Sequence, residues 1–176
     1  MIQSESNVQI KELIKLQKNA RERKKKKLFV AEGMKLTKEA AFHGKLKKIY
    51  IAQDVYEHRE RELDDFLAKQ DYEVVDTKIF RQAAQTVTPQ GMLALVEVPE
   101  YSVDTLLCDP KRSFLLLDDL RDPGNLGTIM RTAEGAGMSG VILSRESVDL
   151  FNPKVVRATM DNAIFLSVIL SPPYKL

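Results

Sequence analysis

Three residues, Asn125, Gly127 and Arg131, have types and spacing that suit chemistry on a polar substrate. Gly127 and Arg131 are four residues apart, so on a helix they share a face, with Gly127 one turn nearer the helix start. A glycine there lets a ligand or another backbone approach closely. Arg131 adds a permanent charge and a planar fork of donors, which suits a phosphate or a ribose oxygen. The structural alternative is that Arg131 pairs with Glu134 or Asp118 and that Gly127 only lets the helix pack on the sheet.

The surrounding sequence predicts the elements that position these residues. Residues 114–117 (FLLL) form a short apolar run typical of a buried strand, and a loop rich in Asp, Pro and Gly follows up to Asn125. We expect Asn125 to cap a helix that ends at Gly137, and residues 141–143 to form the next strand. Strand, helix and strand make a right-handed βαβ unit with parallel strands. Ligands bind beyond the carboxyl ends of such strands, where the loop lies.

Residues 122–133, DPGNLGTIMRTA, resemble the first motif, N-x-G-x-x-x-R-x-A, of the SpoU/TrmH class of SPOUT RNA 2′-O-ribose methyltransferases. The flanking LLLDDLRDPGN, GAGMSGVILS and VDLFNPKVVRATM agree with this family. Upstream, LFVAEGMKLTKEAA and VTPQGMLALVE resemble the two ends of the substrate-binding domain that often precedes the catalytic domain. The resemblance therefore covers nearly all of residues 8–165. The loop contains neither the G-x-G-x-x-G pattern of dinucleotide-binding enzymes nor a phosphate loop that ends in G-K-[ST]. The sequence therefore gives little support to a dinucleotide-dependent enzyme.

Carried over by position, the resemblance implies roles for two residues. Asn125 would hold the loop and contact the active site. Arg131 would position the ribose 2′-hydroxyl for attack on the methyl group of S-adenosylmethionine. Because the pKa of arginine exceeds about 12, we expect Arg131 to orient and stabilise charge rather than to act as a base. The family holds the methyl donor in a deep trefoil knot built from two later motifs, so we expect the cofactor-binding residues beyond Leu176. The chain is then expected to be a fragment or a naturally short protein, and the complete enzyme a homodimer.

The composition excludes several other classes of protein. The chain has 176 residues, 44% of them hydrophobic, enough for one large or two small packed domains. No apolar run approaches the roughly 18 residues of a membrane span, and the N-terminus is too polar for a secretory signal. The single cysteine, Cys108, leaves no internal disulfide, and His43 and His58 have no partner at metal-ligand spacing. We therefore expect a cytoplasmic protein without a metal or a membrane contact.

The net charge of +2 hides an asymmetry. Residues 1–48 carry fourteen Lys and Arg against five Asp and Glu, and the remainder carries thirteen against twenty. We expect a single helix over residues 8–27, with the basic residues gathered toward its end. The densest cluster, which we expect to bind RNA together with Gly127, consists of Arg21, Arg23, Lys24, Lys25, Lys26 and Lys27. Such a cluster binds polyanions by releasing counterions. The alternative is a solvated helix end whose cations suit the helix dipole.

Alternating strands and helices between residues 28 and 98, among them a charged helix over residues 55–69 and a strand over residues 72–75, predict a small α/β/α sandwich. The resemblance implies the same fold, a ribosomal-protein-like RNA-binding domain in which Gly33 and residues 90–91 flank an RNA-facing edge, although both could be turn residues only. We expect this domain over residues 1–105, a linker over 106–112, and over 113–176 the first βαβ part of a SPOUT (knotted Rossmann-like) methyltransferase domain. The fold class is thus α/β.

Two functions follow from the sequence. The first is an RNA methyltransferase that transfers a methyl group from S-adenosylmethionine to a ribose 2′-hydroxyl, with ribosomal RNA favoured as substrate by analogy. The second is a non-catalytic RNA-binding protein that retains the basic N-terminal domain.

Overall fold

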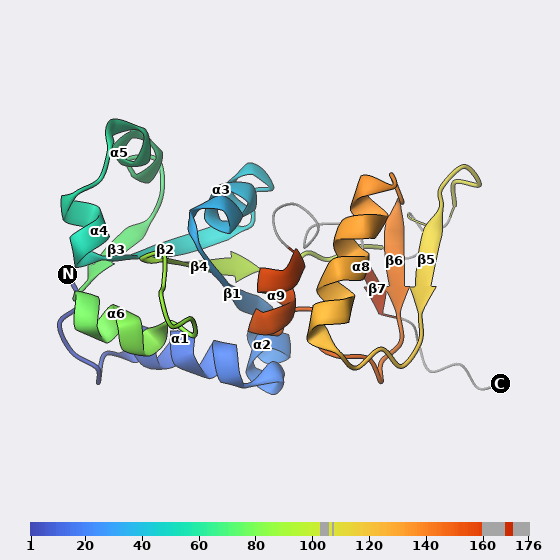
Figure 1. Ribbon diagram of the computed structural model, residues 1–176, viewed down its shortest axis with the longest axis horizontal. Helices are drawn as coiled ribbons and strands as arrows, with labels where there is room; N and C mark the ends of the chain where they lie inside the picture. The colour runs from blue at the N-terminus through green and yellow to red at the C-terminus, as the bar shows by residue number, and fades with distance from the viewer. Residues whose placement is uncertain (103–105, 107, 160–167, 171–176) are drawn as a thin grey trace. The chain divides into compact units, whose positions relative to one another are not determined.

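The computed structural model describes residues 1–102, 106, 108–159 and 168–170. The chain divides into two compact units, residues 1–98 and residues 99–176 (Figure 1). The linker expected at residues 106–112 belongs to the second unit. Each unit is described below by itself.

The first unit is built on a four-stranded mixed sheet. Its strands are β1 (Leu28–Glu32), β2 (Leu46–Ala52), β3 (Tyr72–Val75) and β4 (Met92–Glu97). They lie in the order β1-β4-β2-β3, where β4 is antiparallel to both of its neighbours and β2 is parallel to β3. Strand β4 is the last strand of this unit along the chain, but it lies in the middle of the sheet, where it is buried on both faces.

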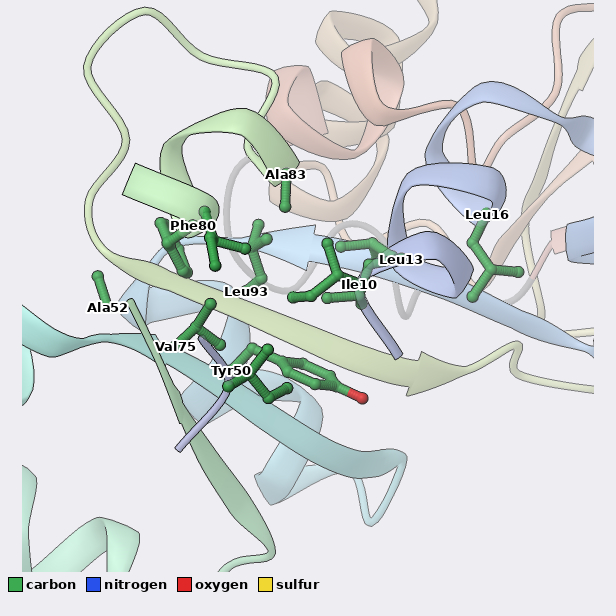
Figure 2. Close-up of a cluster of buried hydrophobic side chains, with 12 residues drawn as sticks. Ile10, Leu13, Leu16, Tyr50, Ala52, Val75, Phe80, Ala83 and Leu93 are labelled. Atoms are coloured by element: carbon green, nitrogen blue, oxygen red, sulfur yellow. The ribbon is translucent and has the colours of Figure 1, made fainter. Parts of the chain in front are cut away.

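Helices cover both faces of this sheet, which confirms the predicted α/β/α sandwich (Figure 1). They are α1 (Val8–Lys18), α2 (Ala20–Lys26), α3 (Met34–Phe42), α4 (Gln53–Glu57), α5 (Arg61–Leu67) and α6 (Thr77–Ala83). Side chains alternate along each strand, so Tyr50 and Ala52 of β2 join a cluster with α1 and α6 (Figure 2). Ile49 and Ile51 point to the other face and pack with α5.

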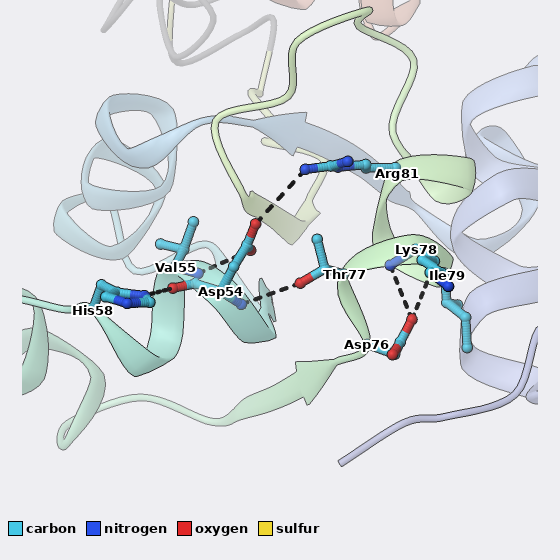
Figure 3. A network of polar contacts seen from close by, with 8 residues as sticks. All are labelled: Asp54, Val55, His58, Asp76, Thr77, Lys78, Ile79 and Arg81. Carbon is cyan, nitrogen blue, oxygen red and sulfur yellow. Dashed lines mark hydrogen bonds and ion pairs between the residues drawn. The ribbon is translucent and has the colours of Figure 1, made fainter.

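Two helices predicted as continuous are each broken in two. The helix expected over residues 8–27 is interrupted at Asn19, which closes α1 and also caps α2, since its side-chain oxygen accepts from the backbone N–H of Arg21 at 2.9 Å. The helix expected over residues 55–69 is interrupted after Glu57. There the Nδ1 of His58 lies 2.8 Å from the carbonyl oxygen of Asp54 (Figure 3). Local hydrogen bonds of Asn and His side chains thus end helices that hydrophobic periodicity alone would continue.

The second unit contains a three-stranded parallel sheet, β5 (Phe114–Leu117), β6 (Gly140–Leu143) and β7 (Val168–Leu170), in the order β5-β6-β7. Helix α8 (Pro123–Gly135) connects β5 to β6, and α9 (Pro153–Thr159) follows β6. The parallel pairing of β5 with β6 around α8 is the predicted βαβ unit. The two helices pack against each other, so α8 has α9 on one side and solvent on the other.

The ends of these helices agree only in part with the sequence. Gly137 has a φ of 72°, the left-handed conformation expected just after the helix, and Asn152 caps α9 by accepting from the N–H of Lys154 at 2.9 Å. Asn125, however, is not the N-cap of α8. That position belongs to Asp122, whose carboxylate accepts from the N–H of Asn125 at 2.6 Å. Because proline suits the first helical position, the helix begins at Pro123 and Asn125 lies in its first turn.

None of the described helices is long and apolar enough to cross a membrane. Over the same described residues, no group of three His, Cys, Asp or Glu side chains is placed to hold a metal ion.

Candidate functional site

The candidate site lies where β5 ends and α8 begins. Asp119 has a φ of 47° and receives two hydrogen bonds from Arg121, at 2.8 and 3.0 Å. The hydrogen bond and the positive charge of Arg121 lower the pKa of Asp119 below its usual value. Asp122 then starts α8 as its N-cap, because its side chain accepts a hydrogen bond from the backbone N–H of Asn125. The loop that precedes the helix is therefore held by its own acidic and basic side chains.

Two serines that follow β6 fix this loop from the neighbouring strand. The backbone N–H of Asp119 donates to the hydroxyl oxygen of Ser144 at 2.9 Å, and that of Leu120 donates to Ser147 at 3.1 Å. The N–H of Val148 returns a bond to the carbonyl of Leu120 at 2.8 Å. Sequence reasoning missed these serines, although Ser144 stands directly after the apolar run of β6. Their bonds join the loops at the carboxyl ends of both strands, so the start of α8 is positioned by the sheet.

Asn125 and Arg131 both lie on the exposed side of α8. Thr128 stands between them at spacings of three residues, so the three side chains form one ridge about 9 Å long. The hydroxyl of Thr128 donates back to the carbonyl of Gly124 at 3.0 Å. An amide, a hydroxyl and a guanidinium in a row give donors and acceptors that match the hydroxyls and phosphates of a sugar–phosphate chain.

Gly127 does not open a gap for a ligand. It is buried, and a Cβ built on it would lie 2.3 Å from the Cβ of Ala158 and 2.7 Å from that residue's carbonyl carbon. The space expected beside Arg131 is therefore filled by α9. For Gly127, the packing alternative is closer to what is seen, except that this residue packs on a helix and not on the sheet. This contact corrects the assignment of Gly127 to RNA binding.

The basic cluster is divided by the structure into buried and exposed members. Arg23 is 4% exposed, and its Nη1 donates to the carbonyl oxygens of Leu16 and Gln17 at 2.5 and 3.1 Å. It therefore caps the C-terminal end of α1, where carbonyls lack helical partners and the helix dipole favours a cation. Arg23 is thus a structural residue and not part of an RNA-facing surface. The exposed members of the cluster are Arg21, Lys24, Lys25, Lys26 and Lys27.

The structure also brings Gly33 and residues 90–91 together at one end of the first sheet. A Cβ on Gly33 would lie 2.6 Å from the side-chain oxygen of Gln90, and both Gly33 and Gly91 have positive φ angles, 105° and 77°. Beside them is a cavity of about 380 Å³ that Gly91 and Arg81 help to line. Arg81 reaches toward Asp54, 3.9 Å away (Figure 3). Glycine is required at both positions by the backbone alone, which leaves their expected place on an RNA-facing edge a prediction.

Comparison with known proteins agrees with this division of the chain. The family model described as MRM3-like substrate binding domain matches residues 7–94, and that of the SpoU rRNA Methylase family matches residues 112–172. The chain therefore belongs to the SpoU/TrmH class of RNA methyltransferases and carries an MRM3-like substrate-binding domain.

Three relatives show how far the likeness extends. A 23S rRNA (guanosine(2553)-2′-O)-methyltransferase of Bacillus subtilis is 32% identical over 170 residues, which cover 96% of this chain and 64% of the relative. The human mitochondrial rRNA methyltransferase 3 is 34% identical over 149 residues, 78% of this chain and 34% of the relative. A crystal structure of an AdoMet-bound rRNA methyltransferase from Sinorhizobium meliloti superposes with a TM-score of 0.81 at 29% identity and covers 96% of this chain and 63% of that one. The chain thus spans less than two thirds of the length of each of these relatives.

Proposed function

We propose that the protein is an RNA 2′-O-methyltransferase that acts on ribosomal RNA with S-adenosylmethionine as methyl donor. The observation that carries the proposal is the position of Asn125 and Arg131 on the exposed side of α8, directly after β5. Membership of the family and the activities named for its relatives supply the reaction and the substrate.

The described residues supply the ribose side of this reaction. A ribose hydroxyl is a weak nucleophile, and a guanidinium beside it stabilises the charge that develops on the oxygen. Arg131 provides that charge, while Asn125, whose backbone N–H is held by Asp122, orients the ribose or its phosphate. Ser144 and Ser147 keep the loop in place, so the ridge on α8 meets the substrate in one geometry.

S-adenosylmethionine supplies an activated methyl group when it is bound. The Sinorhizobium relative, whose structure is described as AdoMet-bound, supports this choice of donor. We assign no residue of the described chain to hold the donor. The hydroxyls of Ser144 and Ser147 are engaged with each other and with the backbone of the loop before α8. We further propose that the protein forms a homodimer, as the family resemblance implies, and that it works in the cytoplasm on ribosomal RNA.

Transfer of labelled methyl groups tests this proposal. Full-length protein incubated with ribosomal RNA and S-adenosylmethionine labelled in its methyl group should transfer the label to the RNA. The alternative, a non-catalytic RNA-binding protein, predicts saturable RNA binding with no label in the RNA. RNA binding is measured on the same samples by filter retention. It distinguishes a protein that binds the RNA but does not methylate it from a protein that does not bind the RNA at all.

A further inference from the structure

Helix α2 has two faces of different character. Glu22 and Lys26 are four residues apart and share one face, which lies against α1. Glu22 pairs with Lys15 at 3.1 Å, and Lys26 pairs with Glu12 at 2.5 Å. Buried Arg23 lies next to this face and holds the end of α1. The inner face of α2 is therefore fastened to α1 by two ion pairs and a capping arginine.

The opposite face of α2 carries only cations. Arg21, Lys24 and Lys25 have the spacing i, i+3, i+4, so they point together and away from α1. Lys18, the last residue of α1, lies three residues before Arg21. All four side chains are exposed, and among the residues that the structure describes none of them makes an ion pair. We name Lys18, Arg21, Lys24 and Lys25 the basic corner.

The fixed geometry of the corner distinguishes it from a flexible basic tail. Asn19 stops α1 and starts α2, and Arg23 ties the start of α2 to the carbonyls of Leu16 and Gln17. The ion pairs on the inner face engage Glu12 and Glu22, the acidic side chains of the two helices. Lys25 also attracts Glu22 electrostatically, but no described carboxylate forms an ion pair with the outer face. The four cations are thus presented by folded backbone, which lowers the entropy cost of binding.

We propose that the basic corner binds the phosphate backbone of the RNA substrate and positions it without reading its sequence. The inference rests on the proposed function, because it takes RNA as the substrate. The outer face of α2 carries Arg21, Lys24 and Lys25 and no aromatic or amide side chain, and such a charged surface suits phosphates. Recognition of the particular nucleotide then falls to other parts of the protein.

A matched pair of double variants tests the inference. Lys24→Gln with Lys25→Gln removes two charges from the corner, while Lys69→Gln with Lys78→Gln removes two exposed lysines elsewhere in the same unit that also make no described ion pair. Each lost phosphate contact should lower the slope of log affinity against log salt by about 0.7 to 0.9. We expect the corner variant to lose about 1.5 in slope and about ten-fold in affinity at physiological salt, equally for RNAs of different sequence. The control variant should match the wild type.

Three results would overturn the inference. Equal loss in both variants would mean that bulk charge and not the corner attracts RNA. Loss for one RNA sequence only would mean that the corner reads bases. An unchanged affinity would remove RNA as the occupant and leave an acidic protein surface as the partner to seek. Because binding is measured without the methyl donor, a protein that binds RNA through the corner but transfers no methyl group would refute the proposed function and leave this inference standing.

Discussion

Replacing Arg131 by alanine should lower methyl transfer by at least about 100-fold, because a preorganised group that stabilises charge in a transition state is worth that much. Affinity for RNA should change by no more than about two-fold, since in the proposed mechanism the guanidinium acts chiefly on the reacting oxygen. Single-turnover rates and filter binding on the full-length protein give the two quantities. Arg131 is exposed on α8, so its truncation leaves the buried side of the helix intact.

Two further variants sharpen the Arg131 test. Arg131→Lys keeps the charge and loses the planar fork, so it should recover only part of the activity. Thr132→Ala removes a neighbouring exposed side chain whose hydroxyl only donates back to the carbonyl of Thr128, and it should be as active as the wild type. A fully active Arg131→Ala protein would refute the role assigned to Arg131.

Replacing Gly127 by alanine should destabilise the second unit by about 1–3 kcal/mol, the usual cost of overpacking a closely packed contact. The new methyl group would lie 2.3 Å from the Cβ of Ala158 and would force α8 and α9 apart. Denaturant unfolding measures this cost directly. Methyl transfer should fall too, because α8 carries Arg131.

Gly135→Ala is the matched control for this substitution. Gly135 belongs to the same helix, but a Cβ built on it has nothing within 4 Å. Its replacement should be neutral or should stabilise the helix by up to about 1 kcal/mol, the difference in helix propensity between glycine and alanine. Equal stability of the two alanine variants would contradict the close packing of α8 on α9.

Much of the fold was predictable because its strands are short apolar runs separated by clear turn residues. Residues 72–75, for example, were predicted with the bounds that the structure gives β3. The break at Asn19 was not predicted, because the helical pattern of residues 8–27 continues through it. What ends α1 there is partly the guanidinium of Arg23, a contact that only the folded corner reveals. The start of α8 could have been placed correctly, since the pair Asp122–Pro123 is a cap followed by a first-turn proline.

The site was harder to predict than the fold, because its residue types are ambiguous in isolation. A glycine near the start of a helix allows the close approach of either a ligand or another helix. At Gly127 it is Ala158 of α9, distant in sequence, that packs closely. A run of Lys and Arg in the sequence likewise does not indicate which side chains are buried. The buried Arg23 is therefore predicted, together with the exposed lysines beside it, to bind RNA. Ser144 and Ser147 have no motif of their own, and their role appears only once the two loops lie side by side.

The position of the transferred methyl group tests the central claim most directly. Ribosomal RNA treated with the full-length protein and methyl-labelled S-adenosylmethionine is hydrolysed in alkali, which cuts a phosphodiester bond only where the neighbouring 2′-hydroxyl is free. If Arg131 and Asn125 present a ribose hydroxyl to the donor, the label will be found in alkali-resistant dinucleotides. Label in mononucleotides would place the methyl group on a base and would contradict the account.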